Sequence, residues 1–314
     1  MKRFCLLFAL ALALALPARA ALAAPLRLAL SDTAAQDSPE ALADAYFAQL
    51  VEERTDGRVR IELHLDGALY ADDALAVEAL ILGETAFARV SADAAAAFSP
   101  GLYVLQMPGL YADDAHMTAA LADARAGGLA LDAMRPAGLI GLCFYDGGPR
   151  GVVTGSGGAL SGLRVRVPDG ASARALAEVL DVQPVPQGAQ EAVDGAMGPW
   201  SVCASFPGAA CYWELDHARA LSVLLASEMA LAAAGVSDTD LTAIAQCAQE
   251  TQRYQFEALA MREERAQAAA QAAGVQRVEV DLQALEALRR AATASEADAQ
   301  AELVEAVRAL APEK

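Results

Sequence analysis

Strand-like and helix-like segments alternate along the first 145 residues, and no other feature of the chain limits its fold as much. Residues 59–65 (VRIELHL) alternate apolar and polar side chains as a strand does, and a helical pattern runs before them from residue 39 to about 54. Further helices are predicted at about 72–82 and 116–134, and further strands at 26–31, 85–90 and 139–145. This order predicts an α/β fold with a largely parallel sheet.

A glycine-rich stretch from Gly147 to Gly158 (GGPRGVVTGSGG) follows the last of these strands. Glycines here could form a phosphate loop, but the stretch matches neither GxxxxGK[ST] nor GxGxxG. It also lacks the GxSxG elbow that would make Ser156 a nucleophile. We therefore interpret the stretch as a hinge between two domains.

One long helix is predicted from about residue 237 to 273. Ser237 or Asp238 would cap its start, and Gly274 would end it. Apolar or small residues recur along the segment and indicate a face packed on the rest of the fold. A coiled-coil arm is the alternative, but the sequence has no sustained heptad.

The first 24 residues have the pattern of a secretory signal. Lys2 and Arg3 precede an apolar run that Pro17 ends, and small residues offer cleavage after Ala20 or Ala23. The alternative is an uncleaved anchor, but the apolar run is shorter than the roughly 20 residues that span a bilayer. The chain is therefore expected to be exported to the periplasm.

The net charge limits the partners of the protein. The formal charge of the chain is -18, and loss of Lys2, Arg3 and Arg19 with the signal would make it -18 - 3 = -21. A chain this acidic is not expected to bind nucleic acid. After a 24-residue signal, 314 - 24 = 290 residues remain, which favours two domains over one.

The sequence gives no sign of a metal site or of catalysis. His64, His116 and His217 are scattered, and the cysteine spacing fits no usual zinc motif. No nucleophile with a base and no closely spaced carboxylate pair is evident, so neither an enzyme nor a cofactor is expected. Cys203 and Cys211 flank a turn at 206–208, where they could form a disulfide or remain two half-buried thiols.

Arg150 and Arg166 lie beside turn-forming glycines and prolines, in GGPR (147–150) and GLRVRVP (162–168). Their planar guanidinium groups match a carboxylate. Arg164 and Arg166 share one face of a strand, but only the carboxyl end of a strand opens onto a cleft in such sheets, which favours Arg166. The alternative for each arginine is a solvated or ion-paired surface residue.

Six blocks, taken in order, resemble the solute-binding proteins of TRAP transporters, the DctP-type family. The blocks lie at residues 47–69 (FAQLVEERTDGRVRIELHLDGAL), 104–116 (VLQMPGLYADDAH), 138–150 (GLIGLCFYDGGPR), 162–170 (GLRVRVPDG), 184–186 (PVP) and 193–195 (VDG). The similarity extends over nearly all of the chain after the signal.

The resemblance implies two α/β lobes, a hinge, a cleft that closes on a ligand and a long helix across both lobes. The N-terminal lobe would comprise residues 25–148 with about 221–262, and the C-terminal lobe residues 149–220 with about 263–314. Such a protein does no chemistry. As a monomer, it would capture a small organic acid and deliver it to integral membrane subunits of the transporter. A sensing subunit that presents the same lobes to a signalling receptor is the alternative.

The resemblance also implies site residues. A carboxylate would be held by Arg166, with Arg150 as a second contact. Two departures from the family pattern change the surroundings: residues 187–192 form a shortened segment, and Gly198 stands where the family often has an asparagine that binds the ligand. Trp200 and Tyr145 could form an apolar wall of the cleft, and the alternative is that each packs in a core. Ser91 at a strand end is another expected cleft residue, and Arg89 would add positive charge.

Overall fold

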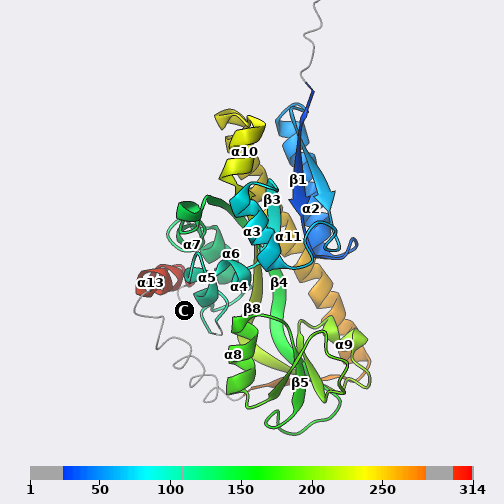
Figure 1. Cartoon of the computed structure of the whole chain (residues 1–314). Helices are drawn as coiled ribbons and strands as arrows, with labels where there is room; N and C mark the ends of the chain where they lie inside the picture. The colour runs from blue at the N-terminus through cyan, green and yellow to red at the C-terminus, as the bar shows by residue number, and fades with distance from the viewer. Residues whose placement is uncertain (1–23, 108, 281–299, 313–314) are drawn as a thin grey trace, which may run out of the picture.

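The computed structural model describes residues 24–107, 109–280 and 300–312 (Figure 1). The signal sequence predicted for residues 1–24 therefore lies outside the described residues except for Ala24. Within the described part, no helix is both long enough and apolar enough to cross a membrane.

The described strands form one continuous sheet in the order β2-β1-β3-β8-β4-β7-β5-β6, and β9 pairs with β8. Pairing is parallel toward both ends of the sheet but antiparallel in its centre, where β8 pairs with β3 and β4, and β4 with β7. The strands are β1 (Leu26–Ser31), β2 (Val59–His64), β3 (Phe87–Ser91), β4 (Leu139–Thr154), β5 (Arg164–Val167), β6 (Gln183–Pro186), β7 (Gly195–Gly198), β8 (Cys211–Ser227) and β9 (Gln276–Glu279).

Two long strands, β4 and β8, run through both halves of the molecule (Figure 1). Their pairing begins at Leu139 opposite Ser227 and ends at Thr154 opposite Cys211. The register shifts between Asp146 and Gly151, so the strands are irregular midway. The strand predicted at 139–145 is therefore longer than expected, and the first part of the glycine-rich stretch belongs to it.

Three of the four predicted helices, at residues 39–54, 72–82 and 237–273, match helices of the structure. Ser38, Asp72 and Ser237 each accept a hydrogen bond from a backbone N–H in the first turn of the helix that follows. The described helices are α2 (Pro39–Arg54), α3 (Asp73–Leu82), α4 (Ala92–Ala95), α5 (Gly101–Val104), α6 (Asp114–Ala122), α7 (Gly127–Asp132), α8 (Ala171–Val179), α9 (Val202–Ser205), α10 (Glu228–Ala234), α11 (Asp238–Ala272) and α13 (Ala301–Ala309), with a 3₁₀ turn at Arg135–Ala137.

The single helix predicted over residues 116–134 is wrong, because the chain breaks it into α6 and α7. Asp123 has extended backbone dihedrals, which ends α6. A Cβ atom at Gly127 would lie 2.3 Å from the carbonyl oxygen of Leu121. Only glycine permits this close return of the chain, so the break depends on a tertiary approach that helical periodicity does not reveal.

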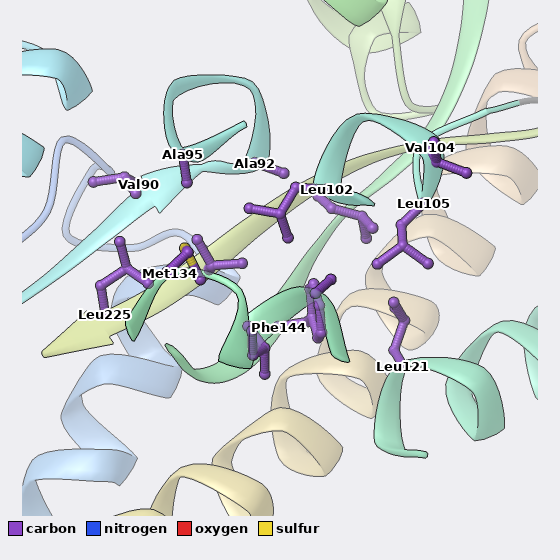
Figure 2. Close-up of a cluster of buried hydrophobic side chains, with 14 of the residues drawn as sticks. Val90, Ala92, Ala95, Leu102, Val104, Leu105, Leu121, Met134, Phe144 and Leu225 are labelled. Atoms are coloured by element: carbon purple, nitrogen blue, oxygen red, sulfur yellow. The ribbon is translucent and has the colours of Figure 1, made fainter. Parts of the chain in front are cut away.

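Hydrophobic side chains form separate clusters in the two halves of the molecule. Two clusters lie in the N-terminal half, and Figure 2 shows the one that includes Leu102, Met134 and Phe144. Two smaller clusters lie in the C-terminal half, where one includes Val165 and Leu176 and the other contains Trp200 and Tyr212. We use the terms N-terminal lobe and C-terminal lobe for these halves.

Helix α13 packs on the N-terminal lobe, although the sequence-based division places residues 263–314 in the C-terminal lobe. Leu303 and Val307 belong to the cluster drawn in Figure 2. A Cβ atom at Gly101 would lie 2.9 Å from Cδ2 of Leu303, so the missing side chain leaves room for α13. This contact links segments far apart in sequence, and local patterns carry no sign of it.

The long helix α11 extends along both lobes (Figure 1). Ile244 and Ala248 pack in a cluster of the N-terminal lobe, whereas Ala266 and Ala270 pack in one of the C-terminal lobe. Gly274 follows the helix with a positive φ of 91°. The predicted packed helix and its stop at Gly274 match the structure.

All four cysteines in the described residues are free and buried, including Cys203 and Cys211. In this structure, Cys203 and Cys211 are therefore two thiols and do not form a disulfide. Within the described residues, no group of His, Cys, Asp and Glu side chains could hold a metal ion. His116 is buried, and its Nδ1 accepts a hydrogen bond of 3.0 Å from the backbone N–H of Ala112.

Candidate ligand-binding site

A cavity of about 530 Å³ lies beside the irregular middle of β4 and β8, against α11 and β9. Its wall combines charged side chains of both signs with an aromatic and aliphatic part. The described lining residues are Asp114, Asp146, Pro149, Arg150, Trp200, Tyr212, Glu214, Leu215, Ala218, Arg219, Leu259, Ala260, Glu263, Glu264, Gln267, Arg277, Glu279 and Val280. Two residues singled out in the sequence, Arg150 and Trp200, are therefore in this wall.

Arg150 is 6% exposed and lies where β4 passes from one lobe to the other. Its Nε donates a 3.1 Å hydrogen bond to the carbonyl oxygen of Arg219, and its Nη2 donates one of 3.1 Å to Oε1 of Gln106. The third nitrogen, Nη1, is buried without a hydrogen-bond partner among the described residues. A buried guanidinium with an unused donor is poorly compensated for its loss of water, so it is suited to receive an anion.

Arg219 of β8 is a second buried arginine in the cavity wall, and the sequence analysis did not select it. Its Nη2 lies 2.9 Å from Oδ2 of Asp146 and 3.2 Å from Oδ1 of Asp114. The only local sign was an arginine within the apolar stretch ARALSVLLA (218–226). Such a residue must find a buried partner, but the sequence does not identify that partner.

Two opposing effects act on the pKa of the Asp146 carboxyl group. Burial raises the pKa of Asp146 to about 6, although the Arg219 charge and the N–H of Gly148 favour the ionised form. Gly148 donates a 2.8 Å hydrogen bond to Oδ1 of Asp146. The negative charge beside Arg219 therefore decreases as the pH falls toward 6.

The apolar part of the wall is an aromatic pair. Trp200 and Tyr212 are both buried and stack with ring centroids 3.9 Å apart and an angle of 27° between the rings. The Tyr212 hydroxyl donates a 2.9 Å hydrogen bond to the carbonyl oxygen of Gly198, the last residue of β7. Gly198 thus orients Tyr212 through its backbone, without the side-chain donor expected from the family pattern.

Arg166 lies outside the lining of the cavity in this structure. Its Nη1 donates to the carbonyl oxygen of Ala189 at 3.0 Å, and its Nη2 to that of Glu191 at 2.9 Å. Both carbonyls belong to the shortened segment, which contains no helix between β6 and β7. The neighbouring Arg164 forms an ion pair with the Glu191 carboxylate. The shortened segment therefore packs against the guanidinium of Arg166, which the family pattern identifies as the main contact of the ligand.

Arg89 and Tyr145 lie in a polar cluster inside the N-terminal lobe. Arg89 forms a buried ion pair with Asp32, and its Nη1 donates a 2.9 Å hydrogen bond to Oγ of Ser222. The Tyr145 hydroxyl donates a 2.9 Å hydrogen bond to Oδ1 of Asp44. Burial raises the pKa of Asp44 well above its usual range, and the nearby Asp32 carboxylate raises it further.

Ser91 ends β3 and caps α4. Its backbone N–H donates a 2.7 Å hydrogen bond to Oδ2 of Asp73, and its Oγ accepts one of 3.3 Å from the N–H of Ala94. The structure therefore brings Arg150 and Trp200 to the cavity wall, and places Ser91, Arg89 and Tyr145 in the N-terminal lobe with partners of their own. A cavity with a buried guanidinium and an aromatic wall can hold a small anionic solute without any catalytic group.

Solved structures share this fold. A TRAP periplasmic solute-binding protein from Bradyrhizobium sp. BTAi1, in complex with α/β-D-galacturonate, matches with a TM-score of 0.74 and 24% identity over 90% of this chain and 99% of that one. Another from Citrobacter koseri, with bound D-glucuronate, matches with a TM-score of 0.77 and 22% identity over 90% and 98% of the two chains. At these identities the likeness shows the fold alone, which has two α/β lobes.

The chain belongs to the bacterial extracellular solute-binding proteins, family 7, whose model matches residues 30–302. This family consists of solute-binding proteins and not of enzymes. The C4-dicarboxylate-binding periplasmic protein DctP of Rhodobacter capsulatus is 32% identical over 144 residues, which cover 45% of this chain and 41% of the relative. The matched segments span less than half the length of the curated relatives.

Proposed function

We propose that this protein captures a small organic acid outside the cytoplasm and delivers it to the membrane subunits of a TRAP-type transporter. The observation that carries this proposal is the buried Arg150, whose Nη1 has no hydrogen-bond partner among the described residues. Membership of a family of extracellular solute-binding proteins supports the transport role. The relatives with bound sugar acids and the dicarboxylate-binding relatives support a carboxylate as the ligand group.

In this proposal, Arg150 is the main contact of the ligand carboxylate. Its Nη1 is the unused donor, and among the described residues Nη2 contacts the amide oxygen of Gln106 at 3.1 Å and the Asp93 carboxylate at 3.7 Å. Two guanidinium nitrogens can bind the two oxygens of a carboxylate in parallel. Trp200 would supply the apolar wall beside this contact.

We propose Arg166 as a second anion contact that becomes available when the lobes rearrange. Its described hydrogen bonds end on carbonyl oxygens, which do not neutralise its charge. Gly198 would support the aromatic wall, because its carbonyl oxygen accepts from the Tyr212 hydroxyl. Ser91, Arg89 and Tyr145 would stabilise the N-terminal lobe as helix cap, buried ion pair and hydrogen-bonded packing residue, respectively, without contacting the ligand.

The negative net charge of the protein does not prevent binding of an acid. Exposed charges farther away than about 8 Å are largely screened at physiological salt. A buried guanidinium acts at contact distance, where the surrounding dielectric is lower. We therefore expect the local attraction at Arg150 to exceed the repulsion from distant surface carboxylates.

A thermal-shift screen against mono- and dicarboxylates, 2-oxo acids and sugar acids should identify the ligand, because a specific ligand stabilises only the folded state. Calorimetry then compares Arg150→Lys and Arg150→Met with the unchanged protein. Loss of a buried charge partner typically costs about 2–5 kcal/mol of binding free energy, so we expect Arg150→Met to bind at least about 30-fold more weakly. The lysine variant keeps the charge but loses the planar fork, so we expect an intermediate affinity.

The control for these variants is Arg164→Lys, because Arg164 is exposed and pairs with Glu191 at the surface. We expect its affinity to stay within about twofold, as a surface ion pair contributes little. Affinity unchanged in Arg150→Met would refute the role of Arg150. Absence of any stabilising carboxylate would refute the proposed ligand class.

We further propose that the mature protein is a periplasmic monomer released by cleavage after Ala20 or Ala23. Mass spectrometry of the exported protein gives the new N-terminus, and sedimentation gives the oligomeric state. A mature chain that still begins at Met1, or a stable dimer, would contradict these two parts of the proposal.

A further inference from the structure

Glu263 is a second buried charged side chain in the cavity wall, and its charge is opposite to that of Arg150. It lies on α11 and is 8% exposed. Its Oε2 accepts a 3.3 Å hydrogen bond from the backbone N–H of Ser201, whereas Oε1 is buried without a hydrogen-bond partner among the described residues. These contacts leave the negative charge of Glu263 without a positive partner. A buried carboxylate of this kind is suited to receive a cationic group.

The Glu263 carboxylate lies beside the aromatic pair of the wall. Ser201, whose N–H it binds, directly follows Trp200. Burial raises the pKa of Tyr212, and the nearby Glu263 carboxylate raises it further. One turn along the same face of α11, Ala266 packs against the cluster that contains both rings. The face of a tryptophan or tyrosine ring attracts a cation, so the rings and the carboxylate favour the same kind of group.

The rest of the cavity wall is acidic. Its described residues include three arginines but six aspartates and glutamates. Arg219 and Arg277 each lie within 4.0 Å of two of these carboxyl groups, so their positive charge is already balanced. Of the three arginines, only Arg150 has a buried donor without a hydrogen-bond partner among the described residues. The cavity therefore offers one place for a carboxylate, and a second carboxylate on the same ligand would meet like charge.

We propose that the ligand is a small zwitterion, whose carboxylate binds Arg150 and whose ammonium group binds Glu263 beside Trp200. The place of the carboxylate rests on the proposed function, whereas the cation position rests on the contacts of Glu263. A hydroxyl group could also donate to Oε1 of Glu263, but it would leave the buried negative charge unbalanced. An ammonium group supplies both the donor and the positive charge. Glu263 therefore selects an amino acid over a dicarboxylate, a hydroxy acid or a sugar acid.

Matched ligands separate these classes in a thermal-shift experiment. The first series compares alanine with propionate, lactate and methylmalonate, and the second compares γ-aminobutyrate with butyrate, γ-hydroxybutyrate and glutarate. Within each series, hydrogen, hydroxyl or carboxylate replaces the ammonium group at one position. The common amino acids and the sugar acids complete the screen. We expect an amino acid to stabilise the protein most, because it alone fills both positions. Greater stabilisation by any dicarboxylate, hydroxy acid or sugar acid would overturn the proposal.

Calorimetry on Glu263→Gln then tests the residue itself, with the best amino acid and its analogue without the ammonium group as ligands. The matched control is Glu257→Gln, the same substitution at an exposed glutamate of α11 outside the cavity lining. We expect Glu263→Gln to bind the amino acid at least about tenfold more weakly and the analogue no more weakly, because only the amino acid loses a charge pair. The control should bind both ligands as the unchanged protein does.

Circular dichroism verifies that Glu263→Gln folds, and Glu263→Asp is a second variant that keeps the charge and should keep the preference for the amino acid. An equal loss of affinity for both ligands in Glu263→Gln would mean that Glu263 only supports the structure of the site, which would overturn the proposal.

Failure of the proposed function gives a different result, in which no carboxylate of any class stabilises the protein. Butylammonium chloride, which needs only the cation position, then decides the inference. Stabilisation of the unchanged protein but not of Glu263→Gln would support a cation position at Glu263. Stabilisation of neither protein would refute it.

Discussion

Replacement of Asp146 by asparagine should change how the stability of the protein depends on pH. Asp146 is 3% exposed and lies 2.9 Å from Arg219, so burial and the ion pair act on its carboxyl group in opposite directions. Burial prevails and raises the pKa of Asp146 from 3.8 to about 6. Between these two values, the folded protein binds a proton that the unfolded chain has released.

A proton held only by the folded state stabilises the protein at low pH, and this stabilisation is lost as the pH rises through the folded pKa. One pKa unit corresponds to about 1.4 kcal/mol, so the contribution is about 3 kcal/mol. Part of this is already lost at pH 4, so we expect the free energy of unfolding of the unchanged protein, minus that of Asp146→Asn, to fall by about 2 kcal/mol between pH 4 and pH 7. The raised pKa of Asp44 acts on both proteins and cancels in this difference.

Urea unfolding monitored by circular dichroism at half-unit steps from pH 4 to pH 7 measures this difference. Asp132→Asn, which removes an exposed carboxylate, controls for the change in net charge. A difference that rises with pH would mean that Arg219 outweighs burial and lowers the pKa of Asp146. A flat difference would mean that the two effects cancel. Either result would refute the reasoning.

Two further substitutions test the packing around the site. We expect Gly151→Ala to cost about 1–3 kcal/mol of stability, because its Cβ atom would lie 2.2 Å from Cζ of Tyr212 and displace that ring from Trp200. Denaturant unfolding measures the loss of stability and tryptophan fluorescence the displacement of the ring, and no change in either would contradict this packing. We expect Tyr145→Phe to cost about 1–3 kcal/mol, because it removes the hydroxyl that donates to buried Asp44. Equal unfolding midpoints with and without the hydroxyl would show that Asp44 finds another partner.

Features that depend on neighbours in sequence were predictable. The caps at Ser38, Asp72 and Ser237 follow from side chains that bond backbone groups within one turn, and Gly274 ends α11 because glycine adopts a positive φ readily. Period-two alternation placed the strand at Val59–His64. The α/β class followed from the order of these segments.

The centre of the sheet was not predictable in the same way. The pattern of separate strands and helices suggested mostly parallel pairing, but β4 and β8 pair antiparallel along most of their length. Pairing between strands more than fifty residues apart depends on how the chain crosses between the lobes. Local periodicity contains no information about that path.

The same distinction applies to the candidate site. Sequence reasoning selected Arg150, which stands beside turn-forming residues in a family block, and Trp200, whose ring could form an apolar wall; both line the cavity. It favoured Arg166 over Arg150, yet the structure turns Arg166 toward the carbonyls of the shortened segment. It missed Arg219 altogether.

The sequence by itself determined the family, the limits of three helices, the α/β class and the presence of arginines suited to a carboxylate, because capping, periodicity and side-chain chemistry act within a few residues. The tertiary structure alone decided which charges meet. Arg150, Gln106 and Asp93 come together only when the two lobes are joined by β4 and β8. A guanidinium is free to bind a ligand only if folding leaves one of its donors unused, and that depends on partners distant in sequence.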